Sequence, residues 1–344
     1  MLKIQHTVCP SCSVGCGIDI ISKDGEVVGT FPYKRNVINE GKNCLNGRNS
    51  IECFESRILT PLVSKRSSDL SEALKIIADE LKNSNPDEIG VICSGNNSNE
   101  EIIAIKEFAN KMGYKIGFSS DNFPNYDGEL ARYDDVDNAK DIYLIGDVVY
   151  NSPLVGRRVF HALDNGASIL AIGTEDKGVT ALNFEFTLVD HISDYFNDAD
   201  IANDSIIIIN EIDSSDEFEI IKSIAEKTNS KLLPIFSKCN TKGALSELEA
   251  NPISDVIESS SILLVFGEDE IEDLTKVKKI FTFSANENDV TDASEVVIPI
   301  KFWIENGGSF TNAMGDVQNF VQILDAPEGI LSGIEIVEKL QEKV

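Results

Sequence analysis

Four cysteines near the N-terminus have the spacing of ligands to a metal centre. Cys9, Cys12 and Cys16 lie on one short segment, and Cys44 follows after 27 further residues, in the spacing C-x2-C-x3-C-x27-C. Three thiolates on a tight loop converge on one side of a metal centre, and a fourth from a returning segment completes the ligand set of a [4Fe–4S] cluster. The chemistry of such a centre is one-electron transfer. We interpret these four residues as cluster ligands.

Two other uses of these cysteines stay open. Zinc also takes four cysteines, but structural zinc sites usually pair one C-x2-C with a second close pair, so a lone fourth cysteine favours iron. A redox-active C-x2-C pair, or unligated thiols, would need no metal. Cys53, Cys93 and Cys239 have no partner at ligand spacing. Because a lone cysteine is usually a small buried hydrophobe, we expect these three in the core.

The segment between the third and fourth cysteines is expected to bring them together. Residues 17–31 read as two short strands joined at Asp24-Gly25, a dipeptide typical of tight hairpins. Gly15 and Gly17 would let the backbone lie close to inorganic sulfur. Such a hairpin would return the segment of Cys44 to the loop that carries the other three.

The rest of the chain alternates between apolar runs and helical patterns. The capping-box pattern Ser98 to Glu101 opens a helix that ends at Gly113. This alternation predicts an α/β fold with two doubly wound, Rossmann-like parallel sheets behind the N-terminal β segment. Expected strands are 88–93, 141–145, 168–172, 206–209, 232–236, 262–266, 280–283 and 296–299, and expected helices are 69–81, 101–112, 155–163, 217–227 and 334–343.

Composition excludes several classes of protein. The 344 residues contain 58 Asp and Glu against 30 Lys and Arg, a formal net charge of -28 that repels a phosphate backbone, so we expect no nucleic-acid partner. No apolar run approaches the roughly 18 residues that a membrane span needs. The first residues leave no room for a secretory signal, which predicts a cytoplasmic location.

Three segments connect an expected strand to an expected helix, at the sheet edge where doubly wound proteins bind ligands. They are residues 94–99, 146–158 and 239–244. The first could cradle an anion at a helix N-terminus, and the second adds Arg157 and Arg158, which could grip phosphate. For each segment an ordinary capped turn is the competing interpretation.

Taken together, these motifs resemble the molybdopterin-dependent oxidoreductases, including formate dehydrogenase large subunits and the large iron–sulfur subunit of respiratory complex I. The resemblance covers nearly the whole chain. It implies a [4Fe–4S] domain at residues 1–62, a discontinuous α/β domain at 63–125 and 204–344, and an inserted α/β domain at 126–203. The matching stretches are residues 9–16, 44–48, 57–62, 100–101, 152–158, 166–170, 240–244 and 303–318.

The chain departs from this family around the pterin cofactor. It ends where the family's C-terminal dinucleotide-binding barrel would begin. Asn46 stands where the family usually has a lysine between cluster and pterin, and a neutral amide cannot supply that charge. Ser120 and Asp121 stand where the family places the metal ligand, although both residues are also common in turns. Glu175 falls where formate dehydrogenases have an arginine for the guanine nucleotide.

These observations predict an iron–sulfur electron-transfer subunit of a cytoplasmic oxidoreductase complex, formate dehydrogenase-like but without a catalytic residue or substrate site of its own. Its partners would be other redox subunits, ferredoxin-like or flavoprotein, in a hetero-oligomer. In the first alternative, molybdopterin guanine dinucleotide is retained and the chain is the core of a formate or formylmethanofuran dehydrogenase type of Mo/W enzyme, with the barrel on a separate chain. A zinc-stabilised interaction protein is the second.

Overall fold

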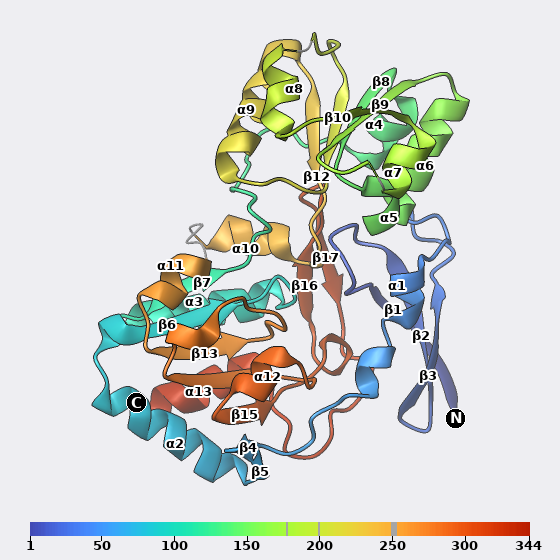
Figure 1. Ribbon diagram of the computed structural model, residues 1–344. Helices are drawn as coiled ribbons and strands as arrows, with labels where there is room; N and C mark the ends of the chain where they lie inside the picture. The colour runs from blue at the N-terminus through green and yellow to red at the C-terminus, as the bar shows by residue number, and fades with distance from the viewer. Residues whose placement is uncertain (177, 199, 249–252) are drawn as a thin grey trace.

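The computed structural model describes residues 1–176, 178–198, 200–248 and 253–344 (Figure 1). A small antiparallel sheet at the N-terminus precedes two larger, mostly parallel sheets that carry helices. The predicted α/β class with an N-terminal β segment is therefore confirmed. Among the described helices, none combines the length and the apolar character that a bilayer crossing requires.

The N-terminal sheet has the order β1-β2-β3 and positions the cysteines. Asp24 and Gly25 have φ of 52° and 94°, the left-handed values of a tight hairpin turn, so the predicted hairpin is confirmed. The strand preceding it was not predicted. The elements of residues 1–62, which we call the N-terminal unit, are β1 (Leu2–Val8), β2 (Gly17–Lys23), β3 (Glu26–Pro32), α1 (Leu45–Asn49) and the 3-10 turn η1 (Glu52–Phe54).

A seven-stranded sheet forms the lower part of the α/β body, as we call residues 63–344 (Figure 1). Its order is β5-β4-β15-β14-β13-β6-β7, and within it β4 runs opposite to the other strands, so its pairings with β15 and β5 are antiparallel. The predicted capping box of Ser98 and Glu101 opens α3, and Gly113 ends it with φ of 72°. The strands are β4 (Leu62–Val63), β5 (Arg66–Ser67), β6 (Ile89–Cys93), β7 (Lys115–Phe118), β13 (Ile262–Phe266), β14 (Lys279–Ser284) and β15 (Val296–Pro299).

Helices cover both faces of this sheet, as its fully buried strands require. They are α2 (Leu70–Asn83), α3 (Asn99–Met112), α10 (Thr241–Glu247), α11 (Ile253–Glu258), α12 (Asp289–Ala293) and α13 (Gly333–Lys343), with 3-10 turns η2 (Pro86–Glu88), η3 (Leu274–Lys276) and η4 (Trp303–Glu305). A separate hairpin of β16 (Gly308–Thr311) and β17 (Val317–Phe320) extends toward the N-terminal unit.

A five-stranded, all-parallel sheet forms the upper part of the body, in the order β10-β9-β8-β11-β12. Its strands are β8 (Asp141–Ile145), β9 (Ser168–Gly173), β10 (Glu185–Leu188), β11 (Ile206–Ile209) and β12 (Lys231–Pro234). Its helices are α4 (Tyr133–Asn138), α5 (Val148–Asn151), α6 (Pro153–Asp164), α7 (Val179–Asn183), α8 (Ile192–Asp198) and α9 (Ser215–Thr228).

Strand pairing moves one expected boundary. The inserted segment was expected to end at residue 203, but β11 pairs with β8 and β12 pairs with β11, so this sheet takes in the chain as far as Pro234. All four residues of β11 are buried. A strand buried on both faces reads as a plain apolar run, and nothing in that local pattern states which of two sheets it joins.

Candidate functional site

The loop that carries the first three cysteines closes on itself between β1 and β2. The Cys9 N–H donates to the Cys16 carbonyl at 2.8 Å. Gly15 adopts φ of +80°, and a Cβ atom there would lie 2.1 Å from Gln318 Oε1, so the loop needs glycine at this position. The tight loop keeps the three cysteines at one end of the small sheet.

Cys44 returns to this loop as the N-cap of α1. Its Sγ accepts a hydrogen bond from the Gly47 N–H at 3.3 Å, and a Cβ on Gly47 would lie 3.5 Å from Cys9 Sγ. Asn39 ties the returning segment to the start of β2: its Oδ1 accepts from the Gly17 N–H, and its Nδ2 donates to the Gly17 carbonyl, each at 3.0 Å. The structure thus brings the start of α1 beside Cys9.

The four thiols act on one another electrostatically. Burial raises the pKa of Cys12 to about 12, and the charges of Cys9 and Cys44 add to the rise. Burial raises the pKa of Cys16 well above its usual range, with Cys12, Cys9 and Cys44 contributing. All four are free of disulfides. Buried thiolates that repel one another need a cationic centre between them, so this donor set fits an iron–sulfur cluster.

A single ion and a polynuclear centre need their ligands in different arrangements. A zinc ion needs all its ligands around one point. In the described ranges, no three His, Cys, Asp or Glu side chains are placed to hold one ion in this way. A cubane instead distributes its four thiolates over separate irons.

The α/β body holds the cysteine loop from two sides. The Tyr133 hydroxyl donates to the Val14 carbonyl at 2.8 Å. Ser13 exchanges two bonds with Phe236, just past β12: its N–H donates to the Phe236 carbonyl at 3.2 Å, and its Oγ accepts from the Phe236 N–H at 2.8 Å. The loop is therefore positioned by the five-stranded sheet as well as by its own hairpin.

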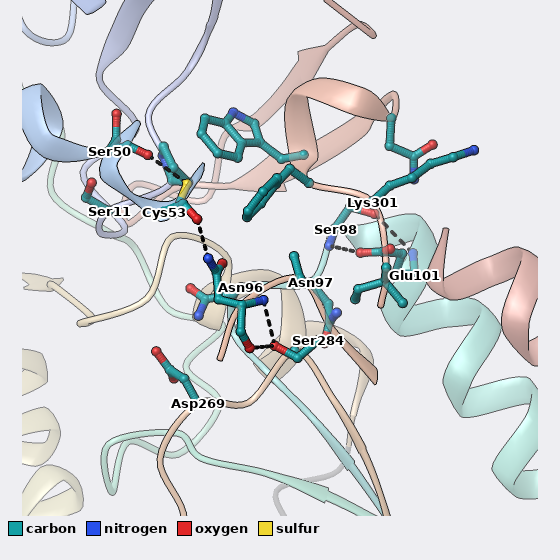
Figure 2. A pocket seen from close by; sticks show the side chains of 18 of the residues that line it. Ser11, Ser50, Cys53, Asn96, Asn97, Ser98, Glu101, Asp269, Ser284 and Lys301 are labelled. Atoms are coloured by element: carbon teal, nitrogen blue, oxygen red, sulfur yellow. Dashed lines mark hydrogen bonds between the residues drawn. The ribbon is translucent and has the colours of Figure 1, made fainter. Parts of the chain in front are cut away.

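A first cavity of about 620 Å³ lies between the N-terminal unit and the carboxyl ends of β6, β13 and β14 (Figure 2). Asn286 Nδ2 donates to the Cys53 carbonyl and, at 2.9 Å, to Ser56 Oγ, which joins the two parts across the cavity. Trp303 contributes an indole N–H without a partner among the described residues. Asn96, Asn97 and Ser98 from the predicted loop line the cavity, as do Glu52, Glu101, Asp269, Glu287 and Lys301.

A second cavity of about 750 Å³ lies at the carboxyl ends of β8, β11 and β12. Its lining includes Cys12 and Cys44, and Ser11 and Asn46 line both cavities, so the two meet at the cysteine loop. The charged residues of this lining are Asp121, Glu211 and Asp213.

Carboxylates dominate the edge of the second cavity. Burial raises the pKa of Glu211, and the charges of Asp213, Glu175 and Asp147 raise it further. Asp147 is the N-cap of α5, and its carboxylate also accepts from the Val179 N–H at the start of α7, at 2.8 Å. These groups make the edge repulsive to an anion.

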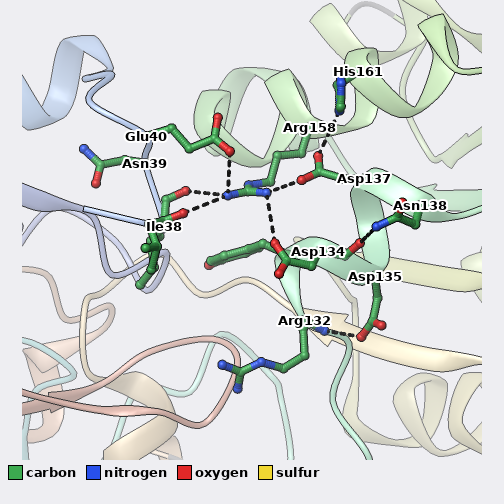
Figure 3. A network of polar contacts seen from close by, with 12 residues as sticks. Ile38, Asn39, Glu40, Arg132, Asp134, Asp135, Asp137, Asn138, Arg158 and His161 are labelled. Atoms are coloured by element: carbon green, nitrogen blue, oxygen red, sulfur yellow. Dashed lines mark hydrogen bonds and ion pairs between the residues drawn. The ribbon is translucent and has the colours of Figure 1, made fainter. Parts of the chain in front are cut away.

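The two predicted phosphate-gripping arginines are structural. Arg158 is 2% exposed, pairs with Asp137, and donates to the Val37 and Ile38 carbonyls at 3.1 and 2.9 Å (Figure 3). Arg157 pairs with Glu40 at 2.6 Å. Both guanidinium groups fasten the returning segment of the N-terminal unit onto α6.

The predicted segment at residues 239–244 also has a structural role. Asn240 donates to the Asn97 carbonyl at 2.8 Å and accepts from the Thr311 N–H at 2.6 Å. Lys242 donates to the Tyr126 carbonyl at 2.5 Å. The turn at 239–244 therefore links α3 to the β16-β17 hairpin and lines neither cavity.

The residues that depart from the family lie at the second cavity or beside it. Asn46 lines both cavities, and Asp121 lines the second, where its Oδ2 accepts from Ser237 Oγ at 2.7 Å. Glu175 acts on Glu211 electrostatically. Ser120 lines neither cavity.

The three lone cysteines differ in burial. Cys93 and Cys239 are 0% and 2% exposed, as predicted for core residues. The core prediction is wrong for Cys53, which is half-buried and lines the first cavity, because η1 lies at the junction between the N-terminal unit and the body.

Sequence reasoning missed most of the polar cavity lining. Glu211 and Asp213 follow an apolar strand directly, and that position was a signal that they lie at the ligand-binding edge. Asn286 also follows an apolar strand, and Trp303 lies in a stretch that matches the family, but contacts between distant segments place both at the cavity.

Two protein-family models match successive parts of the chain. Residues 2–56 match the molybdopterin oxidoreductase Fe4S4 domain, and residues 67–211 match the molybdopterin oxidoreductase family. The first domain implies a [4Fe–4S] cluster.

A curated relative covers part of the same region. The F420-dependent formate dehydrogenase 1 subunit alpha of Methanococcus maripaludis is 32% identical over 197 residues, which are 50% of this chain and 28% of that protein. The matched region is thus less than a third of that relative's length.

Two solved structures share the fold. Acetylene hydratase from Pelobacter acetylenicus superposes with a TM-score of 0.64 at 10% identity, over 98% of this chain and 69% of that one. A chain of the formyltransferase/hydrolase complex FhcABCD from Methylorubrum extorquens, solved with methylofuran, gives 0.59 at 11% identity, over 83% and 98%. These two likenesses show the fold, and the two matched sequence families place the chain in the molybdopterin oxidoreductase family, with that family's Fe4S4 domain at its N-terminal end.

Proposed function

We propose that this chain is an iron–sulfur electron-transfer subunit of a formate dehydrogenase-like oxidoreductase complex. Cys9, Cys12, Cys16 and Cys44 would hold one [4Fe–4S] cluster, which supplies one-electron exchange when bound. The α/β body would serve as a scaffold for the cysteine loop and would carry no pterin dinucleotide of its own.

The charge of the cavities is the observation that carries this proposal. A dinucleotide brings a pyrophosphate, which proteins bind with backbone N–H groups or with arginine and lysine. Among the described residues that line the second cavity, the charged ones are all carboxylates. In the first cavity Lys301 pairs with Glu335 at 2.9 Å, and the other charged residues of the lining are acidic. Both cavities therefore repel the cofactor's phosphates.

Metal analysis of the purified protein tests the proposal. We expect about four irons per chain, as one cubane requires, and no stoichiometric molybdenum or tungsten. The brown absorbance should bleach on reduction with dithionite. Colourless protein that contains zinc in place of iron would contradict the proposal.

One observation favours a second candidate, a catalytic core whose barrel lies on another chain. Two cavities of about 620 and 750 Å³ meet at the cysteine loop, on the sheet edges where doubly wound proteins bind ligands. A chain of similar extent also occurs as one polypeptide of the FhcABCD complex. Near-stoichiometric molybdenum or tungsten would support this candidate and overturn the first.

A further inference from the structure

Charge is divided unevenly between the two parts of the chain. Residues 1–62 contain seven Lys and Arg and six Asp and Glu, a net charge of +1. Residues 63–344 contain 23 and 52, a net charge of -29. The ionisable side chains of the part with the cysteines are therefore almost balanced, whereas those of the body are strongly acidic.

Within the N-terminal unit, the positive charge gathers in residues 33–48, which we call the basic segment. Lys34, Arg35, Lys42 and Arg48 are all exposed, and in the described parts of the chain none of them forms an ion pair. The one acidic residue of the segment, Glu40, is already paired with an arginine of α6. The segment thus presents four uncompensated cations.

The basic segment is compact and leads directly to the cluster. A Cβ on Gly41 would lie 3.1 Å from the Lys34 Cα, so the two ends of its turn are in contact. Arg158 holds this turn in place by donating hydrogen bonds to the carbonyls of Val37 and Ile38 (Figure 3). Val37 and Leu45, 83% and 69% exposed, add apolar surface, and Leu45 follows Cys44 in the chain.

We propose that the basic segment is the docking surface for a small acidic one-electron carrier of the ferredoxin type. The -29 charge of the body would repel such a carrier, while the four cations would attract it to the segment that contains Cys44. One electron leaves the carrier's reduced centre and one enters the [4Fe–4S] cluster, without bond changes. This inference rests on the proposed electron-transfer function.

The test compares two charge reversals of equal size in the full, cluster-loaded chain. Lys34→Glu/Arg35→Glu changes the basic segment, and Lys75→Glu/Lys82→Glu changes exposed, unpaired lysines on α2 of the body. The probe is a purified acidic ferredoxin, reduced and freed of reductant, mixed rapidly with each protein over a range of salt. Reduction by methyl viologen radical serves as the measure of cluster integrity.

We expect the segment variant to lower the second-order rate with ferredoxin on the order of tenfold at low salt and to flatten its salt dependence. The α2 variant should change the rate less than about twofold, and viologen should reduce all three proteins alike. Equal loss in both variants, or a wild-type rate that does not depend on salt, would overturn the inference.

Three further outcomes are distinguishable. If sedimentation finds a dimer that Lys34→Glu/Arg35→Glu dissociates, the occupant is the acidic body of a second copy, and the carrier proposal is wrong. If the wild-type chain contains no iron, the proposed function fails and the docking inference fails with it. If iron is present and viologen reduces it, but the ferredoxin rate falls equally in both variants or does not depend on salt, only the docking inference is rejected.

Discussion

The N-terminal unit and the α/β body are stabilised in different ways. In the body, strands such as β6 and β13 are buried along their whole length. In β1 and β3 of the N-terminal unit, most residues are exposed or half-buried, and Leu2 and Phe31 are each 60% exposed. The body has a core of its own, whereas the buried residues of the unit pack into a core that is shared with the body. Since a unit of this size usually needs a metal or another staple, we expect it to depend on its cluster as well.

Removing one cluster ligand is the strongest way to separate the two parts. We expect Cys44→Ser to lose the iron centre, because three thiolates remain and the N-cap sulfur at α1 is gone. The body should keep its helical circular dichroism and its main unfolding transition. Iron content, visible absorbance and calorimetry measure the two effects. A mutant that is wholly unfolded would refute the division.

A second variant leaves the cluster ligands intact and changes the core of the body instead. Phe281 is fully buried in β14, and Phe281→Ala should lower the free energy of unfolding by about 3–5 kcal/mol through lost burial and the cavity left behind. Iron content per folded chain should stay constant. Denaturant titration followed by circular dichroism and by cluster absorbance checks this expectation. Loss of iron before the body unfolds would mean that the two parts are more tightly coupled than we infer.

The contact between the parts is tested at α6. Arg158→Leu leaves Asp137 and two carbonyls without their buried donor, and we expect it to cost about 2–3 kcal/mol locally. Hydrogen exchange of residues 33–42 should rise. Arg157→Leu is the matched control, because its pair with Glu40 is half exposed and should contribute less than about 1 kcal/mol. Equal exchange in both variants would contradict this assignment.

The smallest effect is expected from Asp147, in the body. Burial acts to raise its pKa, but hydrogen bonds from Thr180, Val179 and Tyr150 outweigh burial and hold the pKa below its usual range. This stabilisation is fully present above the unfolded pKa of about 3.9 and is lost as the pH falls through the folded value. Asp147→Asn should therefore cost about 1 kcal/mol at neutral pH and less below pH 4.

Denaturant titrations at several pH values measure this difference. Asp164→Asn, an exposed carboxylate on α6, is the control and should behave like the wild type. A difference between Asp147→Asn and the wild type that grows as the pH falls would reverse the sign of the argument.

Local patterns predicted many elements of this molecule. The hairpin at Asp24-Gly25, the capping box at Ser98 and the left-handed end of α3 at Gly113 all lie where short-range chemistry put them. The strands β7 and β10 were missed, because each is a four-residue edge strand that is only partly buried. Partial burial weakens the apolar run on which a strand prediction rests.

The cysteine spacing predicts the sulfur ligands of the candidate site, whereas the surroundings of the site were not predicted. The spacing of the cysteines indicated an iron–sulfur cluster. Arg158 was considered for phosphate binding because arginine often has that role, but it is buried and pairs with Asp137. The role of an arginine depends on what faces it. Its partners here, Val37 and Ile38, lie about 120 residues away in the chain.

The sequence alone determined the α/β class and the family, because these depend on periodicity and on motifs that can be read along the chain, and its cysteine spacing predicts the four-cysteine centre. The tertiary structure decided which sheet Ile206–Ile209 joins, where the two cavities meet, and that their walls are acidic. These features arise from contacts between distant segments. A buried apolar strand satisfies either sheet equally well in its local pattern, and only the packing of the whole chain selects its neighbour.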